Sequence, residues 1–457
     1  MDWAVRIIEC PYTTNATKTA KIMKKITLQF WFLFLSVAVL AQTGHLMQGA
    51  GAVNMSMGGA ATAQPLDITG ALQWNPAAIS TFDRNIIKFD IGLFFSSPEL
   101  NSTVPEFDAF GQPTGNFFSG TTKDSRGVSP MPALAVVWGK PESRHTFGAS
   151  AIGIAGFGVT FAESTSNPIT MPQSMGGFGR VESDYLLLQI GATWAYELND
   201  NFSIGVQPNF NYASLELMPN PTADPTAVGY PSTEAVSATG LGAQIGVFFD
   251  SQSGFKAGAS YKTTQSFSDF EFENTYLDNT PSTNKFNMDY PAILSFGVGY
   301  STTDLDLAVD YRLVDYENTD GFSETGWAPT ASVVGFGWDN ISIISAGVQY
   351  KGVDRLPFRV GYTYSSNPIS DEVAFFNIPA TAIIKNAFQF GFSYIASDRL
   401  SLDAVYHYGT SGGKTTGQLL NPMFIGMAPP YGAIPGSEVS YDMTTSMIMA
   451  GFSYTLK

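Results

Sequence analysis

The sequence predicts an all-β protein: a 14-stranded antiparallel transmembrane β-barrel whose lumen is plugged by its own N-terminal segment. Three observations indicate this fold class. After Arg84 the chain is a succession of stretches in which apolar and polar residues alternate, their connections are alternately short and long, and aromatic residues recur at one end of the stretches. Charged residues make up only 14% of the chain and aromatic residues another 14%, as expected where lipid-facing and lumen-facing side chains alternate.

Residues 1–41 are interpreted as an over-called start followed by a cleaved signal peptide. A basic stretch precedes an apolar run over residues 26–40, and Val39 and Ala41 occupy the −3 and −1 positions of a signal-peptidase site. The run is shorter than the about 20 residues that a spanning helix needs. The single cysteine, Cys10, lies before this cut, so we expect neither a disulfide nor thiol chemistry in the exported chain.

Residues 42–84 are rich in Gly and Ala, nearly uncharged, and lack the sustained period of a strand or a helix. Gly58 and Gly59 permit tight or left-handed backbone, and Pro76 fixes φ and withholds a hydrogen-bond donor. Such a stretch cannot bury an apolar face of its own. Because eight strands already enclose a space that side chains can fill, a wider barrel needs other material in its lumen. We therefore expect residues 42–84 to plug the barrel.

The strands themselves are predicted from alternation. Along residues 305–313, apolar side chains interleave with Asp306, Ala308, Asp310 and Arg312, so the first set should face lipid and the second set the lumen. The predicted strands cover residues 86–96, 131–138, 147–160, 183–198, 202–217, 235–249, 255–270, 290–300, 305–314, 341–350, 358–366, 387–395, 400–408 and 444–456.

The connections have a parity that favours a barrel over a soluble sandwich. Joints after even-numbered strands are short and made of turn residues, for example residues 140–144 and 199–201. Joints after odd-numbered strands are long, for example residues 98–129, 315–340 and 410–442. Aromatic residues at the turn end of every even strand are typical of an interfacial girdle. These are Trp138, Tyr196, Phe249, Tyr300, Tyr350, Tyr394 and Tyr454.

The chain resembles the FadL-type family of outer-membrane fatty-acid transporters, which includes toluene and other hydrocarbon porins. The resemblance begins with the Gly-Ala pattern after Gly49 and the strand that enters at Asn85, and it continues through residues 289–300, 356–364 and 451–454. It implies an N-terminal hatch over residues 42–84 and a barrel over residues 85–457. The hatch positions that carry it are Gly58, Gly59, Asp67, Asn75, Pro76 and Ala77.

The same resemblance implies a passive, energy-independent channel in a Gram-negative outer membrane, with long-chain fatty acids as the default substrate. It implies hydrophobic small molecules as partners, together with outer-membrane lipid and lipopolysaccharide, and a monomer with no catalysis, cofactor or metal. The net charge of −16 argues against nucleic acid as a partner. The alternative is a similar barrel that acts as a docking or shuttle component of a protein secretion system. A lipid-modifying enzyme is a distant third.

The third predicted strand departs from simple alternation. Ile152 and Ile154 lie on the face shared with lumen-facing residues, and Gly153, Gly156 and Gly158 follow at close spacing. Glycines inside a strand weaken it and mark bulges or kinks. These residues with Phe157 resemble the family's kinked third strand, which implies an exit for hydrophobic substrate sideways into the bilayer. The alternative is an ordinary strand whose small residues face the hatch.

Further candidate sites are less specific. The loop from residue 419 to 431 is more apolar than the outer connections over residues 218–234 and 271–288. It is a candidate for substrate capture through Leu420, Met423, Phe424, Ile425 and Met427. Among lumen-facing cations, Lys256, Arg312 and Arg359 are candidates to attract a carboxylate; paired charges in a wetted interior are the alternative.

Two kinds of site are disfavoured. Asp403 and His407 are four residues apart on one strand, about 13 Å, so they do not form a catalytic triad. The three histidines are scattered and suggest no metal site. The acidic loop over residues 315–340 could bind calcium but lacks EF-hand spacing, so a solvated loop is the simpler interpretation.

Overall fold

The computed structural model describes residues 44–108, 110, 112–421, 429 and 431–456. The predicted signal region with Cys10 therefore lies outside the described residues, as do Met423, Phe424, Ile425 and Met427 of the predicted capture loop. Within the described residues, no helix is long and apolar enough to cross a membrane.

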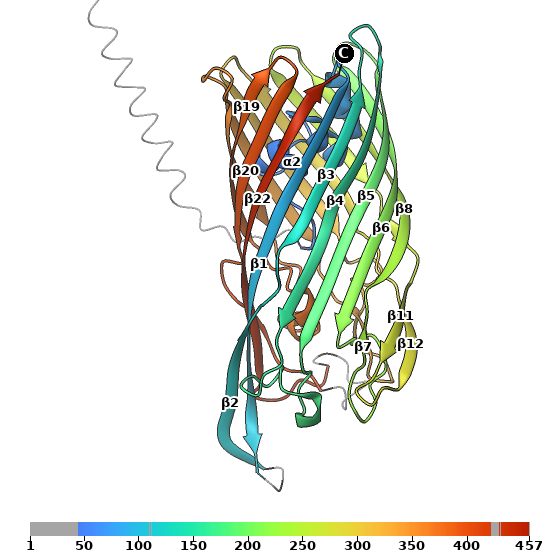
Figure 1. The fold of residues 1–457 in the computed structure, drawn as a ribbon, viewed down its shortest axis with the longest axis vertical. Coiled ribbons are helices and arrows are strands. Elements are labelled where there is room, and N and C mark those ends of the chain that lie inside the picture. The colour runs from blue at the N-terminus through green and yellow to red at the C-terminus, as the bar shows by residue number, and fades with distance from the viewer. Residues whose placement is uncertain (1–43, 109, 111, 422–428, 430, 457) are drawn as a thin grey trace, which may run out of the picture. The chain divides into compact units, whose positions relative to one another are not determined.

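Fourteen strands of the described chain form a closed antiparallel barrel, which confirms the predicted fold class. The first and last strands pair from Ile86 with Thr455 to Thr103 with Glu438, and this ladder closes the wall (Figure 1). The strands are β1 (Ile86–Phe107), β3 (Ser129–Trp138), β4 (His145–Phe161), β5 (Val181–Glu197), β6 (Phe202–Met218), β8 (Val236–Asp250), β9 (Phe255–Lys262), β13 (Ala292–Ser301), β14 (Leu305–Asp315), β17 (Ile341–Tyr350), β18 (Phe358–Ser365), β19 (Asn386–Ser397), β20 (Leu400–Thr410) and β22 (Glu438–Thr455).

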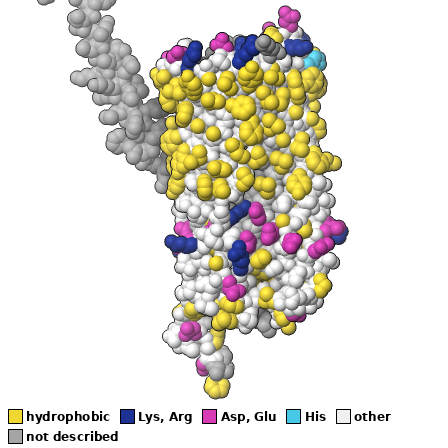
Figure 2. Space-filling model, in the orientation of Figure 1, with side chains coloured by type: hydrophobic (Ala, Val, Ile, Leu, Met, Phe, Trp, Pro, Cys, Tyr) yellow, Lys and Arg dark blue, Asp and Glu magenta, His cyan; other side chains and the backbone are white. Residues whose placement is uncertain are grey.

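The predicted inside–outside alternation is present along the wall. In β14, Leu307 and Val309 are exposed on the outer surface, whereas Asp306, Asp310 and Arg312 are buried inside. Figure 2 shows the result on one face of the barrel as an apolar band, with charged side chains gathered above and below it. This distribution is what a bilayer requires of a β-barrel surface.

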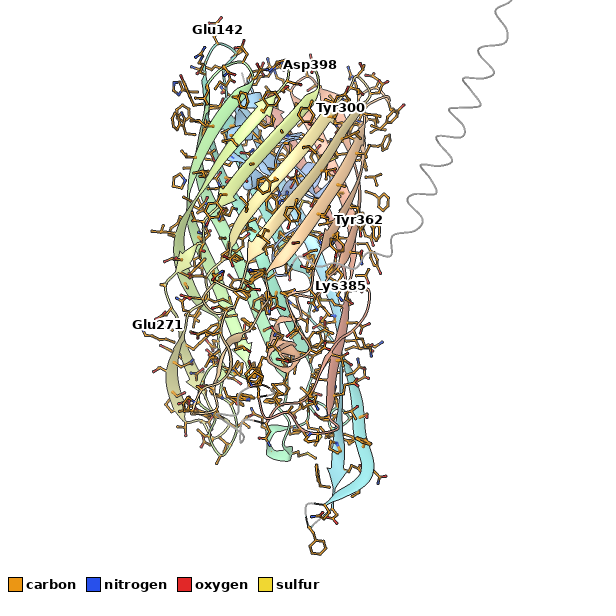
Figure 3. The ribbon with its side chains drawn as sticks, turned by 180° about the vertical axis from the view of Figure 1, so that it is seen from behind. Glu142, Glu271, Tyr300, Tyr362, Lys385 and Asp398 are labelled. Carbon is orange, nitrogen blue, oxygen red and sulfur yellow. The ribbon has the colours of Figure 1, made fainter. Side chains whose placement is uncertain are left out.

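The predicted parity of the connections is also present. Glu142 and Asp398, from two short turns, lie at one end of the barrel, and Glu271, from a long connection, lies towards the other (Figure 3). The long connections contain strands that alternation did not predict. These are β2 (Pro113–Lys123), β7 (Ser232–Thr233), β10 (Ser266–Phe267), β11 (Phe270–Thr275), β12 (Pro281–Phe286), β15 (Thr325–Trp327), β16 (Val333–Phe336) and β21 (Thr415–Gly417).

Three predicted strand ends are wrong by more than about two residues. The last strand was expected to begin at residue 444, but β22 begins at Glu438, where β1 and β21 supply ladder partners. The first strand was expected to end at residue 96, but β1 continues to Phe107 because β22 and then β2 supply ladder partners beyond the apolar stretch. The seventh was expected to reach residue 270, but β9 stops at Lys262, after which β10 pairs with β8 instead. Outside the apolar belt a strand needs no apolar face, so alternation loses its predictive value there.

Residues 44–83, called the plug segment below, lie inside the barrel and form three short helices (Figure 1). These are α2 (Gly51–Ser56), α3 (Ile68–Trp74) and the 3₁₀ helix η1 (Pro76–Thr81). The Asp67 side chain caps α3 by accepting from the Gly70 N–H, and Asn75 caps η1 by accepting from the Ala77 N–H. Capping side chains are favoured at these positions because they satisfy orphan backbone donors. Two further 3₁₀ helices, η2 (Gln173–Met175) and η3 (Ala374–Ala380), lie in the long connections.

Candidate functional site

A buried ionic cluster joins the plug segment to the wall. The Lys88 ammonium of β1 lies 2.5 Å from the Asp403 carboxylate of β20, 3.5 Å from Asp67 in the plug segment and 3.6 Å from Asp90. Asp90 in turn accepts a hydrogen bond from the Ala52 N–H at the start of α2, at 3.0 Å. Burying a charge is costly unless it is paired and hydrogen-bonded, so the plug segment completes this cluster by supplying Asp67 to Lys88 and the Ala52 N–H to Asp90.

A second cluster on β14 binds the plug backbone directly. Asp310 accepts hydrogen bonds from the N–H groups of Ala61 and Thr62, each at 2.9 Å, and from the Thr62 hydroxyl at 2.7 Å. The Arg312 guanidinium bonds to Asp310 and to the Gly59 carbonyl, both at 2.7 Å. It also lies 3.7 Å from the centre of the Trp74 ring, which is favourable cation–π geometry.

Glycines of the wall leave room for the plug backbone. A Cβ atom at Gly246 would lie 2.0 Å from the Asn75 side chain, and one at Gly258 would lie 2.2 Å from the Thr62 carbonyl. A Cβ at Gly361 would lie 2.1 Å from the backbone nitrogen of Gly58. Real Cβ atoms do not approach so closely, so the fit of plug to wall requires glycine here.

The wall contains a window between β1, β3 and β4. β3 and β4 pair only from Trp138 with Phe147 to Ala133 with Ile152, although β4 continues to Phe161. The facing edge of β1 pairs with β3 as far as Phe94 and with β2 from Glu99 onwards. Between these two ladders β1 pairs only with β22, on its other edge. Among the described strands, none pairs with the far half of β4 on the edge that faces β1.

The start of the plug segment occupies the edge of β4 at this window. Leu46 forms an antiparallel bridge with Ala155. The Met47 N–H donates to the Ile154 carbonyl at 2.9 Å, and the Gly156 N–H donates to the His45 carbonyl at 3.0 Å. These bonds satisfy part of the strand edge that β3 leaves open, which matters because unpaired backbone groups are costly in a membrane.

A bulge in β4 lies at the same place. The ladder of β4 with β5 shifts register between Gly153 and Ala155. A bulge adds one residue to one strand, so the inward-facing set changes from even to odd residue numbers. Ile152 is buried before the bulge, and Phe157 and Val159 are buried after it. A register irregularity therefore lies within the predicted path residues, and Ile154 lies at the bulge itself and not on a continuous face. An inward kink that opens a lateral exit stays a prediction.

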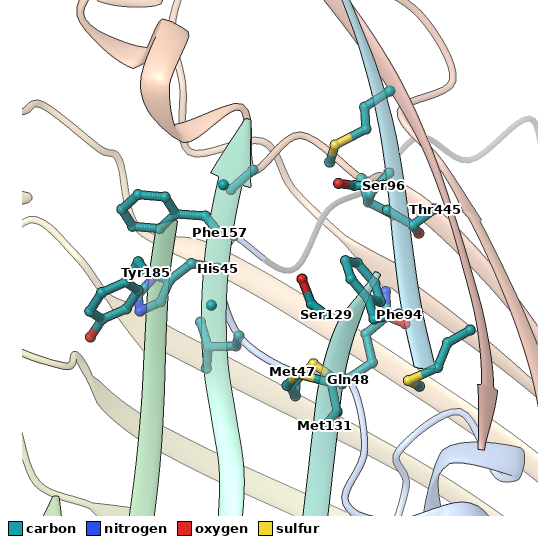
Figure 4. A pocket seen from close by; sticks show the side chains of 18 of the residues that line it. His45, Met47, Gln48, Phe94, Ser96, Ser129, Met131, Phe157, Tyr185 and Thr445 are labelled. Carbon is teal, nitrogen blue, oxygen red and sulfur yellow. The ribbon is translucent and has the colours of Figure 1, made fainter. Parts of the chain in front are cut away.

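An apolar cavity lies behind the window, between the plug segment, β1, β3, β4 and β22 (Figure 4). Its empty volume, including the open mouth, is about 860 Å³. Gly156, Phe157 and Gly158 of the predicted path line it, whereas Ile152, Gly153 and Ile154 do not. It is called the wall cavity below. Its lining from other elements includes Leu46, Met47, Phe94, Met131, Leu186 and Met447.

His45 closes the inner side of the wall cavity within a cluster of aromatic rings. Its Nδ1 atom lies 3.0 Å from the Tyr316 hydroxyl, and its ring stacks on Phe322 at 5.0 Å. Burial among these rings lowers the pKa of His45 to about 3, so the imidazole is neutral near neutral pH. The other rings of the cluster belong to Phe157, Tyr185, Tyr290 and Trp338.

A second apolar pocket lies among the long connections and is called the loop pocket. Its empty volume is about 470 Å³, including open space at its mouth. Four connections supply its lining, which includes Ile169, Phe178, Pro219, Pro221, Trp327 and Phe376. Prolines and aromatic side chains from distant parts of the chain thus form one continuous apolar surface.

Comparison with known proteins places this fold in a family. A family model described as outer membrane protein transport protein (OMPP1/FadL/TodX) matches residues 36–428. The chain belongs to this FadL-type family. The family comprises outer-membrane β-barrels of Gram-negative bacteria that act as channels for hydrophobic compounds. No curated protein sequence matches the chain.

Solved structures of the FadL type share the fold at low sequence identity. A Pseudomonas aeruginosa FadL homologue is 14% identical, with 91% of this chain and 100% of that chain covered and a TM-score of 0.68. The toluene transporter TodX of P. putida is 16% identical, with 90% and 99% covered and a TM-score of 0.64. The Ralstonia pickettii toluene transporter TbuX is 18% identical, with 90% and 99% covered and a TM-score of 0.60.

Within this FadL-type barrel, the three candidate carboxylate-binding cations are separate. Arg312 anchors the plug segment, and Arg359 donates to Gln349 at 2.6 Å and to Ser393 at 2.7 Å. Lys256 lies 3.4 Å from the Ser301 hydroxyl. None of the three lines the wall cavity or the loop pocket, and attraction of a carboxylate by them stays a prediction.

The predicted capture loop is only partly described. Leu420 is buried and forms a bridge with Ala433, so this one side chain is not on the surface. The loop pocket was not predicted, because its residues come from four connections that have no common sequence signal. Arg126 at the wall cavity was also missed, since an isolated arginine in a long polar connection has no distinguishing pattern.

Proposed function

We propose that this chain is a passive outer-membrane channel for uptake of hydrophobic compounds, with long-chain fatty acids as the principal substrate. Substrate enters through the loop pocket, passes between the plug segment and the wall, and leaves sideways through the window beside β4. The exported chain starts after residue 41, and lipopolysaccharide surrounds its outer end. No cofactor or reaction is needed for this function.

The observation that carries the proposal is the wall cavity. It joins an apolar lining to a part of the wall where β1, β3 and β4 are not continuously paired. A hydrophobic molecule there gains the free energy of apolar burial, about 25 cal/mol per Å², and does not have to cross water to reach the bilayer. A closed wall would offer no such route.

The plug segment acts in this proposal as the hatch that keeps water-soluble molecules out. Gly58, Gly59, Asp67, Asn75, Pro76 and Ala77 hold its backbone. Asn75 donates to the Thr62 carbonyl at 2.8 Å and to the Val247 carbonyl of the wall at 3.0 Å. These contacts support a hatch whose body stays in place while substrate passes one side.

The test is uptake of labelled oleate by cells with and without the gene, followed by a variant that fills the window. Ser129 lines the wall cavity, so Ser129→Trp should lower uptake several-fold by occupying the mouth. Thr303→Trp, in an exposed short turn, is the matched control and should retain normal uptake. Equal uptake with and without the gene would refute the transport proposal.

A second candidate function, docking in a secretion system, is favoured by the β1–β2 hairpin. This hairpin projects beyond the rest of the barrel (Figure 1), and Phe107, Phe110 and Phe117 near its tip are exposed by 55%, 89% and 58%. Exposed aromatic clusters are typical of interaction sites. Co-purification of a secreted protein that is lost when residues 103–119 are removed, with oleate uptake unchanged, would favour docking.

A further inference from the structure

The end of the β1–β2 hairpin carries three exposed phenylalanines, called the apolar tip below. Phe107 and Phe117 are more than half exposed, and Phe110, between the two strands, is almost fully exposed. The Asp108 side chain holds Phe110 in place by accepting from its N–H at 2.9 Å and from the Gln112 N–H at 2.8 Å. The hairpin therefore presents apolar side chains at the point where it projects farthest from the barrel (Figure 1).

A polar stem separates the apolar tip from the apolar belt of the barrel. The stem consists of three polar cross-strand pairs on the outward face of the hairpin. They are Glu99 with Lys123 at 3.6 Å, Asn101 with Thr121 at 2.7 Å, and Thr103 with Ser119 at 2.8 Å. Phe107 lies twelve residues beyond Phe95, the last exposed apolar residue of β1 before the stem, or about 40 Å along the strand at about 3.3 Å per residue. The tip is thus too far from the belt to be covered by the same bilayer.

The charge and the size of the tip indicate what covers it. No Lys or Arg occurs between residues 100 and 122, whereas Glu106 and Asp108 lie beside the phenylalanines, so an anionic surface would be repelled. The exposed parts of the three rings offer about 400 Å² together if each whole ring has about 200 Å². This is about half of the roughly 800 Å² that one partner contributes to a stable protein interface. A neutral apolar surface needs no complementary shape, and burial there is favourable in proportion to the apolar area.

The base of the polar stem is bonded to a segment that lines the loop pocket. The Asn167 side chain donates to the Leu100 carbonyl at 3.2 Å and to the Thr122 hydroxyl at 2.9 Å. Two residues later, Ile169 lines the loop pocket, and its N–H donates to the Ser102 hydroxyl at 3.4 Å. A surface bound by the tip is therefore held at the end of the barrel where the loop pocket lies.

We propose that the apolar tip is a docking site for the surface of a neutral lipid or hydrocarbon droplet in water. The three phenylalanines insert into the droplet, and the polar stem spans the aqueous layer between the droplet and the bilayer. The inference goes beyond the proposed function, because it identifies the source from which the loop pocket takes up hydrophobic molecules. In that respect it rests on the channel proposal, but docking is measured without uptake.

The experiment measures co-flotation of the full-length protein, in phosphatidylcholine nanodiscs, with triolein droplets coated by the same phospholipid. Most of the wild-type protein should float with the droplets. A triple variant with Phe107→Ser, Phe110→Ser and Phe117→Ser should float roughly tenfold less, because it loses the apolar area that enters the droplet. Droplets coated with anionic phosphatidylglycerol should bind the wild type more weakly because of the carboxylates at the tip, and stronger binding to them would contradict the neutral-surface assignment.

Met175→Ser combined with Leu277→Ser is the matched control. Both side chains are more than half exposed in other long connections, and neither lines the wall cavity or the loop pocket, so their loss should leave flotation unchanged. Heat-modifiable migration in electrophoresis checks that every variant retains the barrel. Equal flotation of the wild type and the triple variant, or an equal loss in the control, overturns the inference.

Uptake separates a failure of docking from a failure of the channel. Labelled oleate presented on albumin needs no droplet, so its uptake should be equal in the wild type and the triple variant, whereas uptake of oleate dissolved in droplets should fall several-fold. Uptake from albumin without flotation of the wild type would overturn the docking inference alone. Flotation without uptake from either source would refute the channel proposal and leave the docking site in place. Capture of a secreted protein by the hairpin, without flotation, would overturn the lipid assignment in favour of a protein partner.

Discussion

The plug segment meets the wall in two different ways on two sides of the barrel. Towards β8, β9, β14 and β18, its backbone is bonded to fixed groups such as Asp310 and fits against glycines with no spare space. Towards the half of β4 that borders the window, residues 45–47 touch the wall through one bridge and two backbone hydrogen bonds, whereas nearer the short turns Leu72 packs against Gly148. The first contact depends on specific buried side chains of the wall, whereas the second uses backbone groups of β4.

This difference indicates which part of the plug segment can move at a low cost in free energy. Removing the rest of the plug segment would take Asp67 from Lys88 and the Gly59 carbonyl from Arg312, and would leave Asp310 without its two backbone donors. Each buried polar group left without a partner typically costs about 1–3 kcal/mol, and more if it is charged. Displacing the strand at the window forfeits two backbone hydrogen bonds, each worth about 1 kcal/mol. We therefore expect residues 45–47 to detach from β4 while the rest of the plug segment stays in place.

The largest effect is expected from the anchored side. Asp310→Ala removes the acceptor for Ala61, Thr62 and Arg312 and leaves the guanidinium buried without its carboxylate. The free energy of unfolding should fall by about 3–5 kcal/mol. Urea titration followed by circular dichroism measures it, with Asp304→Ala in an exposed turn as the control. Equal stability of the two variants would break the contrast between the two sides.

The window side should respond to pH through His45. Its pKa is about 3 in the folded chain and 6.5 when unfolded. Because the folded pKa is the lower one, the contribution to stability is present above pH 6.5 and is lost as the pH falls towards 3. At about pH 4.5 the strand His45–Met47 should open more easily by roughly 2–3 kcal/mol. Hydrogen exchange measures this opening, and in His45→Phe the extra acid sensitivity should be absent.

A smaller effect is expected at the glycine fit. Gly258→Ala places a methyl group 2.2 Å from the Thr62 carbonyl, and overpacking of this kind costs about 1–3 kcal/mol. We expect a shifted plug segment and faster entry of small sugars in a liposome-swelling assay. Gly127→Ala, where no atom lies within 4 Å of the added Cβ, is the control. Unchanged permeability with unchanged stability would show that the fit is looser than the structure indicates.

The smallest effect is expected from a single hydrogen bond at the window. Met47→Pro removes the N–H that donates to Ile154, which should cost about 1 kcal/mol locally. A cysteine at Leu46 should then react several-fold faster with a maleimide, while one at Ala61 should not, and global stability should be retained because the strand opens separately. A similar rate at Leu46 in both backgrounds would argue that other contacts hold the strand.

The barrel could be predicted from sequence because alternation along strands such as β14 shows which side chains face the lipid and which face the lumen. The window could not, because it depends on how far β3 and β4 pair, and pairing length has no sequence signature. The bulge at Ile154 was signalled only by neighbouring glycines, which mark many local irregularities. The inserted residue changes which side chains of β4 face inward. Alternation continued from Ile152 would bury even-numbered residues, but Phe157 and Val159 are buried after the bulge.

The projecting β1–β2 hairpin has a practical consequence for topology. Its tip belongs to neither the wall cavity nor the loop pocket, so a short peptide epitope inserted near Phe110 would leave both undisturbed. An antibody against that epitope would stain intact cells if the long connections face the medium. The same label would serve as a handle for following single molecules on living bacteria.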